Sequence, residues 1–319
     1  MIALLICATA IPAWATIPDI ERQALLTLYI STHGADWGTS TNWNGAEGTE
    51  CTWFGITCDA ANLHVTSIQL EHNNLTGTLP ALTGLTSLVD FDVLDNHLTG
   101  PVPALTGLTA LQNFLVAFNQ LSGPLPALTN LQTFAANGNQ LTGPIPSLAG
   151  LTNLQTFWVS SNYLTGPLPA LTGLTKLSSF EAYKNGLTGS IPSLTGLTNL
   201  MNFNVSSNDF TGPIPVLSDL TSLRYFSVGT NQLTGSIPAL TGLNNLHYFK
   251  ISRNRLTGSV PTAPASLISN ASSLCPNPLS TTASENDVGW NAATGHTPWW
   301  ATPYNSNRCD DIFTNGFDG

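Results

Sequence analysis

The residues of this 319-residue chain that could do chemistry do not form the pattern of any common catalytic motif. The patterns HExxH, GxSxG and the P-loop do not occur, and no Cys/His spacing matches a zinc site. The six histidines are scattered, and His72 and His97, which lie near Asp95, have the character of solvated loop residues. We therefore predict a non-enzymatic protein that uses no cofactor and holds no metal.

Acidic and aromatic side chains are the better candidates, and they suggest binding. Asp90 and Asp92 are two residues apart, so they share one face of an extended strand. Clustered oxygens can hold Ca²⁺, but known calcium loops are denser and more regular than this pair. Trp158, Tyr183, Tyr225 and Tyr248 are predicted to form an aromatic track on the same face. Trp and Tyr dominate binding hot spots, although scattered surface aromatics are also common. The candidate ligand-binding residues are Asp90, Asp92, Phe118, Trp158, Glu181, Tyr183, Tyr225, Tyr248 and Lys250.

A repeated phrase of 23 residues must position these side chains. Its Asn recurs at a step of 23, with a single step of 20 between Asn119 and Asn139. Nine copies at a fixed period predict a solenoid, which presents a long surface for binding. The nine positions are Asn73, Asn96, Asn119, Asn139, Asn162, Asn185, Asn208, Asn231 and Asn254.

Within one repeat the apolar residues alternate, as in a half-buried strand. Leu88, Phe91 and Val93 are predicted to point inward, while Asp90 and Asp92 face outward. Asn96 then turns inward at a bend and satisfies backbone groups there. The inward aromatic position recurs in eight copies, which predicts a continuous core column: Phe91, Phe114, Phe134, Phe157, Phe180, Phe203, Phe226 and Phe249.

The phrase LxxLxLxxNxLxGxIP over residues 65–261 resembles the plant-type extracellular leucine-rich repeat (LRR), and residues 21–59 are similar to the N-terminal cap of that family. The resemblance implies an α/β repeat fold: a right-handed, horseshoe-like solenoid with a parallel concave β-sheet, which is the face these families use for binding. Two departures from the family pattern are the period of 23 instead of about 24 and the fourth coil, which lacks three residues.

The chain ends predict export. Residues 1–15 read as a signal peptide ending in Ala13-Trp14-Ala15, residues 16–64 as the N-terminal cap, and residues 262–319 as a C-terminal cap and tail. Cys7 belongs to the predicted signal peptide, and the other four cysteines allow three connectivities. Only the local pairs Cys51–Cys58 and Cys275–Cys309 avoid bridging the two ends of a solenoid. The last residues, CDDIFTNGFDG, resemble tails of exported Gram-negative proteins, so we expect a secreted protein from a bacterium.

These features favour a secreted or surface-displayed recognition module that binds a protein or cell-surface glycan. A net charge of −10 makes nucleic acid and anionic membranes poor partners, and no segment predicts membrane insertion. The charge is uneven, because Arg22 is the only base before Lys176. One alternative is an ice-binding surface made by threonine columns on the convex side, and another is a passive adhesin spacer. The oligomeric state stays open.

Overall fold

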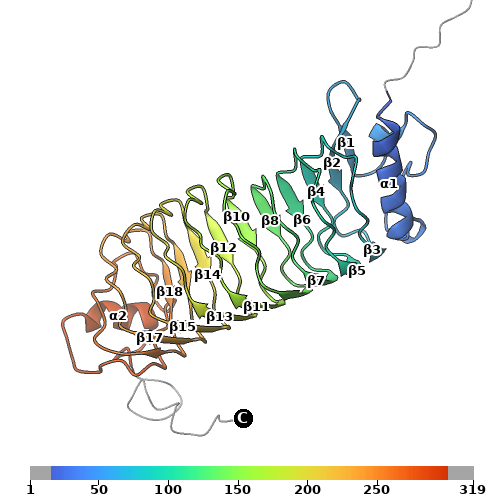
Figure 1. Ribbon diagram of the computed structural model, residues 1–319. Helices are drawn as coiled ribbons and strands as arrows, with labels where there is room; N and C mark the ends of the chain where they lie inside the picture. The colour runs from blue at the N-terminus through green and yellow to red at the C-terminus, as the bar shows by residue number, and fades with distance from the viewer. Residues whose placement is uncertain (1–15, 301–319) are drawn as a thin grey trace, which may run out of the picture.

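The computed structural model describes residues 16–300 and shows a long stack of coils between two caps. Each coil places a short strand in each of two sheets, and in Figure 1 the second of these follows the lower edge of the stack. One sheet has ten strands in the order β1-β2-β4-β6-β8-β10-β12-β14-β16-β18, and the other has nine. Pairing within each sheet is parallel, apart from the antiparallel β1–β2 pair. The predicted repeat solenoid is therefore confirmed.

The ten-stranded sheet, called the first sheet below, is the one predicted from the alternating pattern. Neighbouring coils pair in register, so that Phe157 lies opposite Phe134 and Phe180. The rings of this column are buried and stack with centroids 5.3–6.1 Å apart. Its strands are β1 (Ile56–Cys58), β2 (Val65–Gln69), β4 (Asp90–Asp92), β6 (Asn113–Leu115), β8 (Thr133–Ala135), β10 (Thr156–Trp158), β12 (Ser179–Glu181), β14 (Asn202–Asn204), β16 (Tyr225–Ser227) and β18 (Tyr248–Lys250).

The second sheet is built by a segment that begins two residues after each Asn and reads Leu-Thr-Gly in most coils. The Leu points into the core, as Leu164 does, while Thr165 is exposed on the other side. The pairing register of this sheet is offset by two residues from the 23-residue repeat. Thr165 pairs with Gly186, whereas its equivalent in the next coil is Thr188. The strands are β3 (Thr76–Thr78), β5 (His97–Pro101), β7 (Gln120–Pro124), β9 (Gln140–Gly143), β11 (Tyr163–Pro167), β13 (Gly186–Ser190), β15 (Asp209–Gly212), β17 (Gln232–Gly235) and β19 (Arg255–Leu256).

The repeated asparagines form a ladder between the two sheets. The Nδ2 group of Asn162 donates to the carbonyls of Ala136, Val159 and Ser160, and its Oδ1 accepts from the N–H of Leu141. Each Asn therefore joins its own coil to the coil before it, which satisfies buried backbone groups at the bend. The ladder continues past residue 261, because Asn277 makes the same contacts to Leu256 and Ile251.

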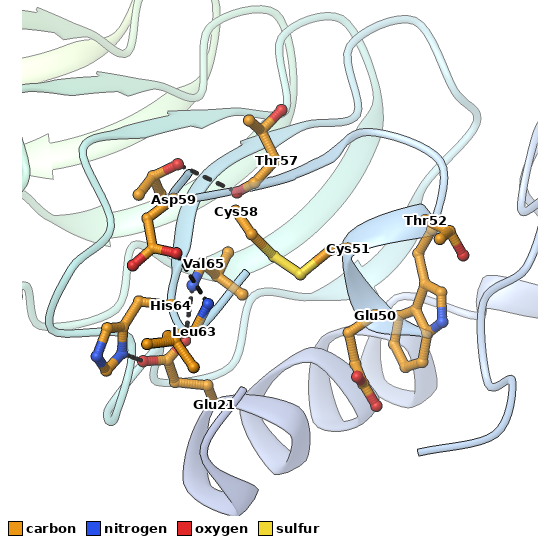
Figure 2. Close-up of a disulfide and its surroundings, with 12 residues drawn as sticks. Glu21, Glu50, Cys51, Thr52, Thr57, Cys58, Asp59, Leu63, His64 and Val65 are labelled. Atoms are coloured by element: carbon orange, nitrogen blue, oxygen red, sulfur yellow. Dashed lines mark hydrogen bonds and ion pairs between the residues drawn. A yellow bond between two sulfur atoms is a disulfide. The ribbon is translucent and has the colours of Figure 1, made fainter. Parts of the chain in front are cut away.

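The N-terminal cap closes the first coil with helix α1 (Asp19–Ser31), two short 3₁₀ helices (Gly34–Asp36 and Glu50–Thr52) and a disulfide. Cys51 and Cys58 are bonded, as predicted, and tie the second 3₁₀ helix to β1 (Figure 2). Glu21 reaches from α1 to the start of the first sheet, where it contacts His64 Nδ1 and accepts from Val65 N. The helix is thus fixed across the open end of the stack.

The C-terminal cap covers the other end of both sheets. Ser273 bridges to Lys250 in the first sheet, and Leu279 bridges to Gly258, two residues after the last strand of the second sheet. Helix α2 (Asp287–Thr294) places Trp290 against Phe249, with ring centroids 5.9 Å apart, so the Phe column ends on an indole. Cys309, residues 1–15 and the tail lie outside the described residues, so the predicted signal peptide and the Cys275–Cys309 pair stay predictions. Within residues 16–300, no helix is long and apolar enough to cross a membrane.

Candidate ligand-binding face

The outward face of the first sheet carries two columns of variable side chains, one on each side of the buried Phe. Because the strands are in register, residues at the same place in successive coils lie next to one another. Trp158 is the largest of them and remains 37% exposed. Its indole Nε1 donates to the Ser179 hydroxyl at 2.8 Å, which fixes the ring across the strand boundary.

A groove of about 610 Å³ opens on this face over β12, β14, β16 and β18. The rings of Tyr225 and Tyr248 are adjacent in the column before the Phe, with centroids 5.6 Å apart and planes inclined by 47°. They form an aromatic wall that is half-buried and open to solvent. The groove is lined by Glu181, Tyr183, Asn202, Asn204, Arg224, Tyr225, His247 and Tyr248.

Cationic side chains gather around the tyrosine wall. Lys250 Nζ lies 5.4 Å from the centre of the Tyr225 ring, a distance typical of a cation–π contact. Arg224 and His247 occupy the position just before each tyrosine, and the His247 ring meets Tyr248 edge-on at 6.5 Å. Among the described residues, none of these three side chains forms an ion pair with a carboxylate. Arg224 and Lys250 can therefore offer positive charge, and His247 a ring nitrogen, to an incoming anion.

Glu181 lies at the opposite end of the same groove. Its side chain forms no hydrogen bond or ion pair with another described residue, and burial raises the pKa of its carboxyl above the usual value. Desolvation acts this way because it disfavours the charged form. Glu181 therefore presents a partly desolvated carboxyl group to whatever enters the groove.

The acidic pair predicted from the sequence lies well away from this groove. Asp90 accepts from Asn113 Nδ2 at 2.5 Å, and Asp92 accepts from Leu94 N at 2.9 Å. Burial raises the pKa of Asp92, and the nearby charge of Glu71 adds to the effect. Between residues 16 and 300, no group of three or more His, Cys, Asp or Glu side chains is arranged to hold a metal ion.

Phe118 lies at the bend after β6, with a left-handed φ of 52° and 55% of its surface exposed. It covers Gly138 of the shortened coil so closely that a Cβ at Gly138 would lie 2.8 Å from the ring. Phe118 therefore covers Gly138, which has no side chain of its own, and does not line the groove.

The structure brings four of the nine predicted residues into the groove: Glu181, Tyr183, Tyr225 and Tyr248. Lys250 adjoins them over Tyr225, whereas Asp90, Asp92, Phe118 and Trp158 lie outside the lining. Arg224 and His247 were not among the predicted residues because they come one residue before the strands β16 and β18. The variation at that position, which is Gln155, Ser178, Met201, Arg224 and His247 in successive coils, was the signal that could have identified them.

Comparison with known proteins agrees with this architecture. Residues 18–59 match the family described as "Leucine rich repeat N-terminal domain". A curated relative from Arabidopsis thaliana, a probable inactive leucine-rich repeat receptor-like protein kinase, is 34% identical over 84 residues, which is 26% of this chain and 12% of that protein. The chain therefore spans only a small part of this relative's length.

Three solved structures show the same fold. The LRR ectodomain of the Arabidopsis thaliana membrane receptor kinase GASSHO1/SCHENGEN3, in complex with CASPARIAN STRIP INTEGRITY FACTOR 2, is 32% identical with a TM-score of 0.69, covering 83% of this chain and 36% of that one. The plant peptide hormone receptor RGFR1 in complex with RGF2 is 30% identical with a TM-score of 0.57, covering 68% and 40%.

The third structure, a plant ice-binding protein, is 22% identical with a TM-score of 0.58, covering 84% of this chain and all of that one. At this identity the likeness concerns the fold alone. The chain thus has the solenoid fold of leucine-rich-repeat ectodomains, and residues 18–59 match a leucine-rich-repeat N-terminal domain. The curated relative and the three solved structures are plant proteins, so the expected bacterial source finds no support among them.

Proposed function

We propose that this chain is an extracellular recognition module that binds an extended peptide segment of a protein partner. The peptide lies in the groove over β12, β14, β16 and β18. The observation that carries the proposal is the groove itself, where two adjacent tyrosines meet Arg224, Lys250 and Glu181, none of which forms an ion pair with another described residue. Tyrosine rings supply large contact area in binding hot spots, and the unpaired polar groups supply direction and specificity.

The dimensions of the groove suit several residues of a peptide. Adjacent strands lie about 4.8 Å apart, so four strands span roughly 14 Å, about four residues of extended chain. Similarity to the plant peptide hormone receptor RGFR1 supports a peptide ligand. The Cys51–Cys58 disulfide supports an extracellular place for the chain, because disulfides persist in oxidising compartments. A glycan partner, which the sequence left open, has no such support.

The test is selection of a displayed library of random linear dodecapeptides on the purified, immobilised chain. We expect enriched peptides that bind in solution with saturable affinity. A variant with Tyr225→Ser and Tyr248→Ser is expected to lose at least tenfold in affinity, the scale of a binding hot spot. Tyr163→Ser is the matched control, since Tyr163 is 66% exposed but belongs to β11 in the second sheet.

Two results would contradict the proposal. Failure of the wild-type chain to enrich any peptide over the bare support would argue against peptide recognition. Equal loss of affinity in the Tyr163 variant and in the double variant would place binding outside the groove. Thermal unfolding of each variant shows whether a loss of affinity reflects a loss of folding.

A further inference from the structure

We infer that the groove selects a dipolar peptide segment, with a basic side chain over Glu181 and an acidic side chain over Arg224, His247 and Lys250. This inference rests on the proposed function and specifies its partner. The groove has opposite charges at its two ends, and each end lacks an internal counter-charge among the described residues.

The cationic end is shaped to receive an anion. Lys250 is held over the Tyr225 ring, and Arg224 occupies the exposed position next to that tyrosine. His247 lies in the next coil, directly after Arg224 in the same column, since the backbone N–H of His247 donates to the Arg224 carbonyl. Arg224 and His247 therefore border the tyrosine wall on one side, Lys250 lies over the Tyr225 ring, and the ring faces limit the access of water to a bound carboxylate.

The acidic end is shaped to receive a cation. Glu181 follows the buried Phe180 on β12, so its side chain leaves the sheet on the groove side. Its strand neighbours, Trp158 and Asn204, are neutral. A Lys or Arg side chain from the partner would supply the missing counter-charge, and partial burial strengthens such a pair relative to one in bulk water.

The register sets the spacing between the two charges of the partner. Glu181, Asn204, Ser227 and Lys250 are successive members of one column, so Glu181 and Lys250 are three strand steps apart. Three steps of about 4.8 Å give roughly 14 Å, which an extended peptide covers in about four residues of 3.3 Å each. Sequences with a basic and an acidic residue about four positions apart are therefore expected to bind best.

The experiment reads the charge pattern of the peptides selected on the wild-type chain. We expect basic and acidic residues three to five positions apart to exceed their frequency in the unselected library, in one order along the peptide. The best sequence is then synthesised with and without its charges, each replaced by Gln, and its affinity is measured by fluorescence anisotropy.

Glu181→Gln is expected to weaken the charged peptide about tenfold and to leave unchanged the peptide that lacks the basic residue. Asp92→Asn is the matched control, because Asp92 occupies the same column, is similarly half-buried and lies outside the groove. Lys250→Gln is expected to weaken only peptides that carry the acidic residue. Its control is Lys184→Gln, an exposed lysine that lies outside the lining.

The outcomes separate the inference from the function on which it rests. Enriched peptides without a paired charge pattern, or equal effects of Glu181→Gln and Asp92→Asn, would overturn the inference while peptide recognition stands. An absence of any enriched peptide would overturn both. Loss of affinity that depends on the matching peptide charge would support the dipolar ligand, because a general loss of folding does not distinguish between the peptides.

Discussion

Removing one rung of the asparagine ladder is expected to cost far more stability than removing an exposed asparagine from the same coil. In Asn162→Ala the N–H of Leu141 loses the Oδ1 acceptor that lies 2.9 Å away. An unsatisfied buried donor of this kind costs about 1–3 kcal/mol. The change therefore acts mainly through one orphaned backbone group.

The three carbonyls that accept from Asn162 Nδ2 each keep another donor. Ala136 O still accepts from Asn139 Nδ2, and Val159 O still accepts from Asn185 Nδ2. Ser160 O keeps the N–H of Gly138. Each lost bond then counts only a few tenths of a kcal/mol, so the free energy of unfolding should fall by about 3 kcal/mol in total.

Urea unfolding followed by far-UV circular dichroism measures this difference, with Asn153→Ala as the matched control. Asn153 is exposed, and its Oδ1 accepts only from Lys176 Nζ at 2.8 Å, so its loss should change the free energy by less than about 0.5 kcal/mol. A repeat array can unfold in stages, so the midpoint and the slope are both compared. Equal midpoints for the two variants would refute the structural role assigned to the ladder.

Three further changes test the caps and the groove. Replacing Cys51 and Cys58 by Ser should destabilise the N-terminal cap by about 2 kcal/mol, as expected for a crosslink over a separation of 7 residues; an unchanged urea midpoint would contradict this. The hydrogen bond to Glu21 raises the pKa of His64 above its usual 6.5, so the stability that His64 contributes is present below pH 6.5 and is lost as pH rises through the raised pKa. His64→Gln should therefore reduce stability more at pH 5.5 than at pH 9, and an equal effect at both would argue against the ion pair. Because burial raises the pKa of Glu181, its ionisation opposes folding, and Glu181→Gln should slightly raise the thermal midpoint at pH 7 but not at pH 4; a lower midpoint at pH 7 would show that the carboxylate contributes to stability.

The core of this fold could be read from the sequence because each core position recurs. The Phe column and the Asn ladder keep their places from coil to coil, so the period alone predicts one stacked sheet and its bend. The second sheet was harder to foresee. Its strands carry Thr, Gly and Pro, which read as turn residues in a single copy and form strands only when coils stack.

The groove could be predicted only in part, because it depends on neighbours across coils and not on a pattern within one coil. Tyr225 and Tyr248 were identified from their outward phase, and the register then made them adjacent. Trp158 was also identified as outward, but Ser179 engages its indole and the groove begins at the next strand. Phe118 was predicted to flank the aromatic track, but its ring covers Gly138 of the next coil.

The most direct test of peptide recognition in the groove is hydroxyl-radical footprinting of tyrosine side chains with and without a selected dodecapeptide. The groove tyrosines, Tyr183, Tyr225 and Tyr248, should be protected at saturating peptide, while the exposed Tyr163 on β11 should react equally in both states. Protection of Tyr163, with the groove tyrosines unchanged, would contradict the proposed site.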